Sequence, residues 1–142
     1  MDLQERLRDL ADRQEITDLI TRYTRAIDTA DWDGIDDVFT PDAVLDYRPS
    51  GGPRTTRDEA KAFIRNLAGF DRWQHLIGQV AIELRGDEAS ATAYFTNPMV
   101  ARAPDGTETL WEVGGYYHHQ LRRTAQGWRS VEMVDDLVWT RS

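Results

Sequence analysis

The sequence contains no cysteine among its 142 residues. Disulfide bonds and thiolate metal sites are therefore excluded. It also has no apolar run long enough to span a bilayer, and the opening Met-Asp-Leu-Gln-Glu-Arg is too polar for a signal peptide. These absences predict a cytoplasmic protein that does not enter a membrane.

Positive charge is scarce as well, because 17 basic residues face 25 acidic ones and the formal net charge is −8. Such a surface disfavours nucleic acid or an anionic membrane as a partner. The chain has no Gly-rich phosphate loop and no nucleophile elbow. No repeat or low-complexity segment divides it, so we expect a single domain over residues 1–142.

Helical periodicity dominates the first half of the chain. Apolar residues recur at three- and four-residue spacing over residues 3–29, which predicts one long amphipathic helix. Pro41 marks the end of a short second helix, and a strand and a third helix follow. We expect these three shorter elements at residues 32–39, 43–47 and 56–67.

The pattern changes to a period of two from Trp73 onward. It predicts four strands joined by short turns, at residues 76–84, 89–101, 109–123 and 128–140. Helices followed by an antiparallel meander indicate an α+β fold. A curved, mostly antiparallel sheet wrapped around the N-terminal helices would form a cone with an apolar interior, which is a natural ligand pocket.

Asp28 is the odd residue of the long helix. It falls in the last helical turn, where a carboxylate faces the negative end of the helix dipole. Asp31 and Asp33 can cap the helical segment that follows them, but Asp28 cannot. It is either a solvated surface charge or a functional group.

Few other polar residues could enter the cone. His75 opens a strand, and on the strand at 109–123 we place the more apolar face inward, with Tyr117 and His119 on it and His118 outside. Adjacent strand histidines point to opposite faces, so the three histidines do not predict a metal site. From the residues alone, His75 can equally be a core histidine bonded to the backbone.

The chain resembles the SnoaL-like branch of the nuclear-transport-factor-like superfamily, and within it scytalone dehydratase and the bile-acid 7α-dehydratases. The resemblance rests on the order of four segments, of which each alone is a weak signal. It extends over nearly the whole chain and is more specific for fold than for reaction. The segments are residues 27–33, 39–47, 74–78 and 114–139.

The resemblance implies a catalytic dyad of Asp28 and His75 at the cavity, with Tyr47 and Tyr23 as assisting tyrosines. It also places Tyr117 in the substrate pocket. In a loose alignment, Ala101 stands where scytalone dehydratase has its second catalytic histidine. Val138 stands where the relatives have an arginine on the last strand. We carry four residues as candidate substrate contacts: Tyr117, His119, Trp73 and Val138.

A dyad of this kind suits proton transfer at neutral pH. An imidazole takes the proton, a carboxylate stabilises the imidazolium, and a tyrosine hydroxyl polarises a carbonyl. We therefore expect a dehydratase that needs no metal or organic cofactor and acts on a hydrophobic cyclic substrate, polyketide-like or steroid-like. An isomerase, a cyclase and a non-catalytic binding domain remain alternatives.

The strands carry more large apolar residues than one cone can bury. The outer face of the sheet is therefore expected to pack against another copy of the chain. The relatives imply a homotrimer, with a homodimer as the second possibility.

Overall fold

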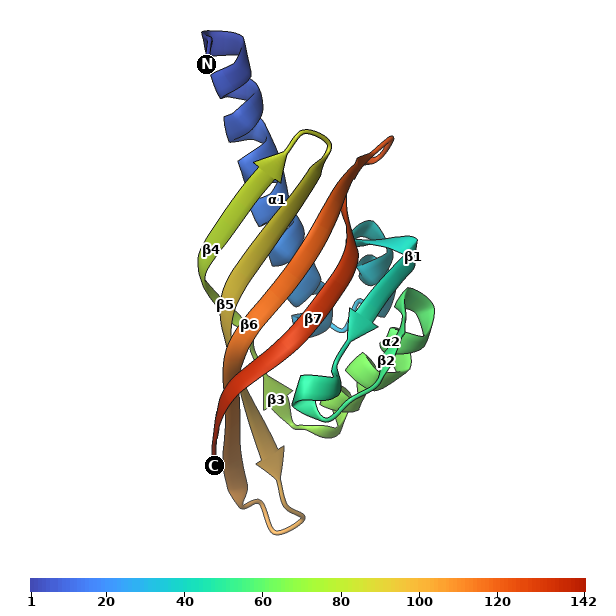
Figure 1. Ribbon diagram of the computed structural model, residues 1–142. Helices are drawn as coiled ribbons and strands as arrows, with labels where there is room; N and C mark the ends of the chain where they lie inside the picture. Colours follow the sequence, from blue (N-terminus) through green and yellow to red (C-terminus); the bar gives the residue numbers. More distant parts are fainter.

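A seven-stranded, strongly curved sheet forms the body of the computed structural model, which describes residues 1–142 (Figure 1). The strand order is β2-β1-β7-β6-β5-β3, and β4 also pairs with β5. All neighbours are antiparallel except β1 and β7, which are parallel. The expected α+β fold is confirmed, with a sheet that curves without closing. The strands are β1 (Phe39–Asp46), β2 (Arg54–Thr56), β3 (Arg72–Trp73), β4 (Leu76–Arg85), β5 (Glu88–Arg102), β6 (Glu108–Thr124) and β7 (Gly127–Arg141).

The long helix α1 (Leu3–Asp28) crosses behind the sheet and covers its concave face (Figure 1). Its apolar stripe is buried there from Ile16 to Ile27, as the periodicity predicts, whereas Leu3, Leu7 and Leu10 near its N-terminus are exposed. The helix ends where Ala30 takes a left-handed φ of 56° and the N–H of Asp31 bonds the carbonyl of Ala26 over 2.8 Å. This sharp ending fixes Asp28 at the rim of the concave face. Neither α-helix has the length and apolarity to cross a bilayer.

An ion pair ties the far end of α1 to the sheet. Arg123 of β6 donates two hydrogen bonds to Asp12 of α1, at 2.7 and 2.9 Å. The indole N–H of Trp128 donates to the same carboxylate over 3.0 Å, and Trp128 is fully buried. Burial of a paired and hydrogen-bonded carboxylate is tolerated, so this cluster holds the helix on the sheet.

The short elements differ from the sequence prediction. The segment expected as a helix at 32–39 is a 3₁₀ helix, Trp32–Asp37, and β1 already begins at Phe39. Pro41 does not end a helix. It lies in β1, where the pairing with β7 shifts between Phe39 and Val44, and a strand irregularity tolerates the missing N–H.

The third helix is also shorter than expected. It is α2 (Arg57–Ile64), followed by a separate 3₁₀ helix, Arg65–Gly69. The sequence prediction missed the short strands β2 and β3. Both are too short to show a period of two, so only their pairing partners reveal them.

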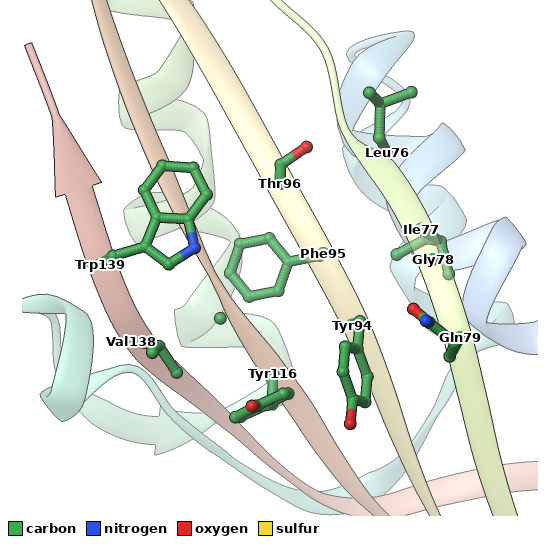
Figure 2. Close-up of a pocket in the computed structure, with 11 residues that line it drawn as sticks. Leu76, Ile77, Gly78, Gln79, Tyr94, Phe95, Thr96, Tyr116, Val138 and Trp139 are labelled. Carbon is green, nitrogen blue, oxygen red and sulfur yellow. The ribbon is translucent and has the colours of Figure 1, made fainter.

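A shallow depression lies on the outer face of the sheet (Figure 2). Tyr94, Tyr116 and Trp139 project into it beside Val138. Trp139 is 40% exposed and Val138 is 58% exposed. Exposed apolar side chains that gather into one patch often mark a surface where another protein binds. The expected homotrimer or homodimer would use this face, and it stays a prediction.

Candidate active site

Asp28 and His75 meet at the rim of the concave face. Asp28 is the last residue of α1, and His75 directly precedes β4. Oδ1 of Asp28 lies 2.6 Å from Nδ1 of His75, and the backbone N–H of His75 donates to Oδ2 over 2.9 Å. One residue therefore holds both carboxylate oxygens, which offsets the unfavourable placement of a carboxylate at the helix C-terminus.

The hydrogen bond also decides which ring nitrogen of His75 is free. A carboxylate at Nδ1 fixes the hydrogen of the neutral ring there, so Nε2 carries the lone pair. The imidazole is only 3% exposed, whereas the Asp28 side chain is 23% exposed. Because His75 lines the internal cavity, Nε2 is the nitrogen that can accept a proton from a bound molecule.

The cavity has a volume of about 220 Å³ and lies between α1, α2 and the concave face of the sheet. Thirteen of its 18 lining residues are hydrophobic, so the few polar groups stand in an apolar surrounding. Electrostatic interactions are stronger in such a medium than in water. No group of three or more His, Asp or Glu side chains is placed to hold a metal ion.

Two tyrosines form a hydrogen-bonded pair in the cavity wall. The hydroxyls of Tyr23, on α1, and Tyr47, just after β1, lie 2.7 Å apart, and both residues are buried. Burial raises the pKa of each hydroxyl well above its usual value, so both stay protonated at physiological pH. One hydroxyl hydrogen bridges the pair, and the other can be donated to a ligand oxygen.

Tyr117 of β6 forms the floor of the same cavity. Its ring stacks on Phe95 of β5 with 4.0 Å between centroids, and it meets Tyr23 edge to face at 5.4 Å. The sequence placed Tyr117 inward, and the structure does the same. A flat aromatic floor of this kind suits a flat cyclic ligand.

His119 does not reach the cavity. It faces inward as expected, but Tyr23 and Phe39 pack over its ring, at centroid distances of 6.3 and 6.1 Å. Its Nδ1 lies 2.9 Å from the hydroxyl of Ser130, and burial, followed by the nearby His118, lowers its pKa to about 3. His119 is therefore a neutral core residue, and its assignment as a substrate contact is wrong.

Trp73 and Val138 also lie outside the cavity. The indole N–H of Trp73 donates to the carbonyl of Ile27 over 3.2 Å, so this side chain braces the helix end that carries Asp28. Val138 lies on the outer face because alternation along β7 turns Asp135 and Leu137 toward the cavity. A bulge then pairs Gly115 with Leu137 and Gly114 with Trp139, and this extra residue places Trp139 on the outer face beside Val138.

The loose alignment of Ala101 with a catalytic histidine is not supported by its position. Ala101 is exposed near the end of β5. The residues of β5 that line the cavity are Phe95, Asn97 and Met99. Oδ1 of Asn97 is buried without a hydrogen-bond partner, so this amide is a polar group that the sequence reasoning missed.

Asp135 is the second polar group that was missed. It lies on β7, where it pairs with Tyr117 of β6, and it lines the cavity. The sequence did contain a sign of its position, because alternation along the last strand places Asp135 on the inward face, between Met133 and Leu137. A carboxylate at such a position needs an explanation, since isolated charges are rarely buried.

Comparison with known proteins places this geometry in a family. The model of the SnoaL-like domain matches residues 8–134. A curated relative, an uncharacterized protein of Mycobacterium tuberculosis, is 36% identical over 128 residues, which are 89% of this chain and 86% of the relative.

Two solved structures from Novosphingobium aromaticivorans have the same fold. A candidate aromatic ring hydroxylase is 31% identical, with a TM-score of 0.80 over 92% of this chain and 91% of that one. A candidate scytalone dehydratase is 15% identical, with a TM-score of 0.82 over 94% of this chain and 88% of that one. The second likeness concerns the fold alone.

Proposed function

Because the chain belongs to the SnoaL-like domain family, we propose that it is a lyase that uses the Asp28–His75 dyad and needs no cofactor. The proposed reaction is dehydration of a small hydrophobic cyclic substrate. One observation carries the proposal: the imidazole of His75 is held by a carboxylate on one side and lines an apolar cavity on the other. This is the arrangement that a general base requires.

The proposed step is an elimination next to a carbonyl. Nε2 of His75 takes a proton from the carbon beside the carbonyl, and Asp28 stabilises the imidazolium that forms. The electrons of the broken C–H bond form an enolate, whose oxygen accepts a hydrogen bond from the Tyr23–Tyr47 pair. When the enolate collapses, the C–O bond to the β-hydroxyl breaks and this group takes the proton from the His75 imidazolium, which leaves water, a C=C bond and neutral His75.

The size of the cavity narrows the substrate class. At about 220 Å³ it is smaller than the roughly 300–1,000 Å³ of pockets for drug-sized ligands. A substrate of one or two rings fits it better than a four-ring steroid. The aromatic floor of Phe95 and Tyr117 favours a planar ring system, so the polyketide-like alternative is preferred.

An isomerase or cyclase would use the same first step, because both also begin with proton removal next to a carbonyl. The test should therefore isolate that step. We propose 2-tetralone, a bicyclic ketone, as a probe in deuterated buffer, with NMR detection of the exchange of its α-protons.

We expect the protein to accelerate this exchange, and we expect His75→Ala to abolish the acceleration while its thermal melting stays cooperative. His118→Ala is the matched control, since His118 faces the outer side of the sheet and bonds Asp136 there. Exchange that proceeds equally well with His75→Ala would defeat the catalytic proposal. A binding domain would show saturable binding of the ketone without exchange.

A further inference from the structure

The carboxyl of Asp135 lacks the partners that a buried charge needs. Its Oδ1 is buried without a hydrogen-bond partner, although the residue lines an open cavity. The nearby hydroxyl of Ser50 donates its hydrogen to the backbone carbonyl of Tyr47 over 2.8 Å, so that hydrogen does not satisfy Oδ1 of Asp135. An orphaned carboxyl oxygen in a cavity wall is a group that a ligand can satisfy.

No cation faces this carboxyl from the elements packed around it. Tyr23 of α1, Tyr47 after β1 and Tyr117 of β6 all lie within its electrostatic influence. For each hydroxyl burial is the largest cause of the raised pKa, and the charge of Asp135 adds to it. Its neighbour Asp136 is also acidic, and it bonds His118 on the outer face over 3.0 Å.

This environment favours the neutral acid. Burial, with a smaller contribution from the charge of Asp136, raises the pKa of Asp135 to about 7. A hydrogen-bonding interaction with Ser50 lowers this pKa but does not outweigh burial. A neutral carboxyl has an O–H to donate, and an ionised one can only accept. Below about pH 7 the cavity therefore contains a carboxylic acid hydrogen that can be donated to a ligand oxygen.

Asp135 and the dyad lie at two separate sides of the cavity. His75 contacts Phe95 of β5, Phe95 stacks on Tyr117 of β6, and Tyr117 pairs with Asp135 of β7. A ring lying on the Phe95–Tyr117 floor could present an acidic C–H to His75 and an oxygen to Asp135. Asp135 stands beside the same tyrosines that the elimination step needs.

We propose that Asp135, as a neutral carboxylic acid, donates a hydrogen bond to the carbonyl oxygen of the substrate. The inference rests on the proposed function for the identity of the reacting carbonyl, but it concerns binding and is tested without turnover. It specifies the substrate class further, as an uncharged cyclic ketone. A substrate with a carboxylate or phosphate at this position would be disfavoured, since no cation faces Asp135 and an unpaired charge is costly in an apolar cavity.

The test compares 2-tetralone with tetralin, which has the same rings and no carbonyl, by calorimetric titration at about pH 5.5 and about pH 8.5. Wild-type protein should prefer the ketone at the lower pH by about fivefold, the size of one net hydrogen bond. The preference should disappear at the higher pH, where Asp135 is ionised. Asp135→Asn should keep the preference at both pH values, because the amide N–H₂ remains a donor.

Asp135→Leu removes the donor and should abolish the ketone preference at both pH values without weakening tetralin binding. If this variant does not fold, the Asp135→Asn comparison decides alone. His75→Ala should retain the preference, so failure of the dyad and failure of this proposal give different results. A wild-type preference that is equal at both pH values, or no binding of 2-tetralone at about pH 5.5, overturns the proposal.

Discussion

Two carboxyl groups belong to the same site, and they differ in their hydrogen-bond partners. Asp28 accepts two hydrogen bonds from His75, at 2.6 and 2.9 Å, whereas Asp135 leaves Oδ1 buried and unpartnered. The first arrangement orients the imidazole of His75, and the second favours the neutral form of the Asp135 carboxyl. A single apolar cavity can therefore offer a proton acceptor on one side and a proton donor on the other.

The difference arises from backbone position rather than from residue type. Asp28 stands at the end of a helix, where the start of β4 brings both a backbone N–H and an imidazole to it. Asp135 stands in the middle of β7, where its backbone N–H and C=O belong to the sheet and only side chains can reach the carboxyl.

The dyad should show the largest effect. His75→Ala should slow the exchange of 2-tetralone α-protons by about a hundredfold or more, the scale of a positioned acid–base group. Asp28→Asn should leave a residual rate, because it removes the charge that supports the imidazolium and keeps most of the shape. NMR exchange rates measure both, with urea unfolding as the stability control, since deleting one partner of a buried pair can also destabilise the fold.

Asp135 should reveal itself in the pH dependence of stability. The pKa of Asp135 is about 7 in the folded protein and near 3.8 when the group is exposed. Its contribution to the free energy of unfolding is therefore complete below about pH 4 and is lost as the pH rises to about 7. Asp135→Asn removes this loss. We expect the variant to gain about 2 kcal/mol in unfolding free energy, relative to wild type, between about pH 5 and about pH 8. Parallel pH dependences in urea unfolding would contradict the neutral-acid assignment.

Tyr47 should have a smaller effect on the exchange reaction. Tyr47→Phe removes one hydroxyl of the pair, and Tyr23 can still donate to the ligand. We expect the exchange rate of 2-tetralone to fall by about three- to tenfold, the value of one neutral hydrogen bond. Tyr94→Phe, on the outer face, is the matched control and should not change the rate. A loss as large as that of His75→Ala would make Tyr47 an essential acid.

The outer face should have no effect on the reaction. Trp139→Ser leaves both sides of the cavity unchanged, and we expect normal exchange of the ketone. If the outer face is where copies of the chain associate, the same change should lower the molar mass measured by light scattering. A wild-type protein that is monomeric at micromolar concentration would refute the expected homotrimer or homodimer.

The sequence predicted the large elements well, because they depend on local signals. Eight inward residues of α1 follow helical spacing, and the long strands alternate for many residues. Asp28 was noticed because its position disagrees with the helix dipole. The resemblance then supplied its partner, His75, which lies 47 positions away and could not be found by spacing.

The two wrong substrate contacts, Val138 and His119, have different origins. Val138 came from the resemblance, and alternation along β7 with Asp135 and Leu137 inward places it outward. Gly114 and Gly115 allow a bulge against β7, since a Cβ at Gly115 would collide with the carbonyl of Asp136, and alternation cannot reveal that this bulge also places Trp139 outward. His119 faces the correct side, but it lies deeper than the cavity, and the covering by Tyr23 and Phe39 depends on tertiary packing.

The proposed mechanism requires that Asp28 holds His75 in the tautomer whose Nε2 is a free base facing the cavity. Nitrogen-15 NMR of the histidine rings measures this tautomer, with His75→Ala used to assign the signals. We expect neutral His75 to carry its hydrogen on Nδ1 and its Nε2 signal to shift when 2-tetralone binds. A neutral ring with the hydrogen on Nε2, unaffected by the ketone, would contradict it.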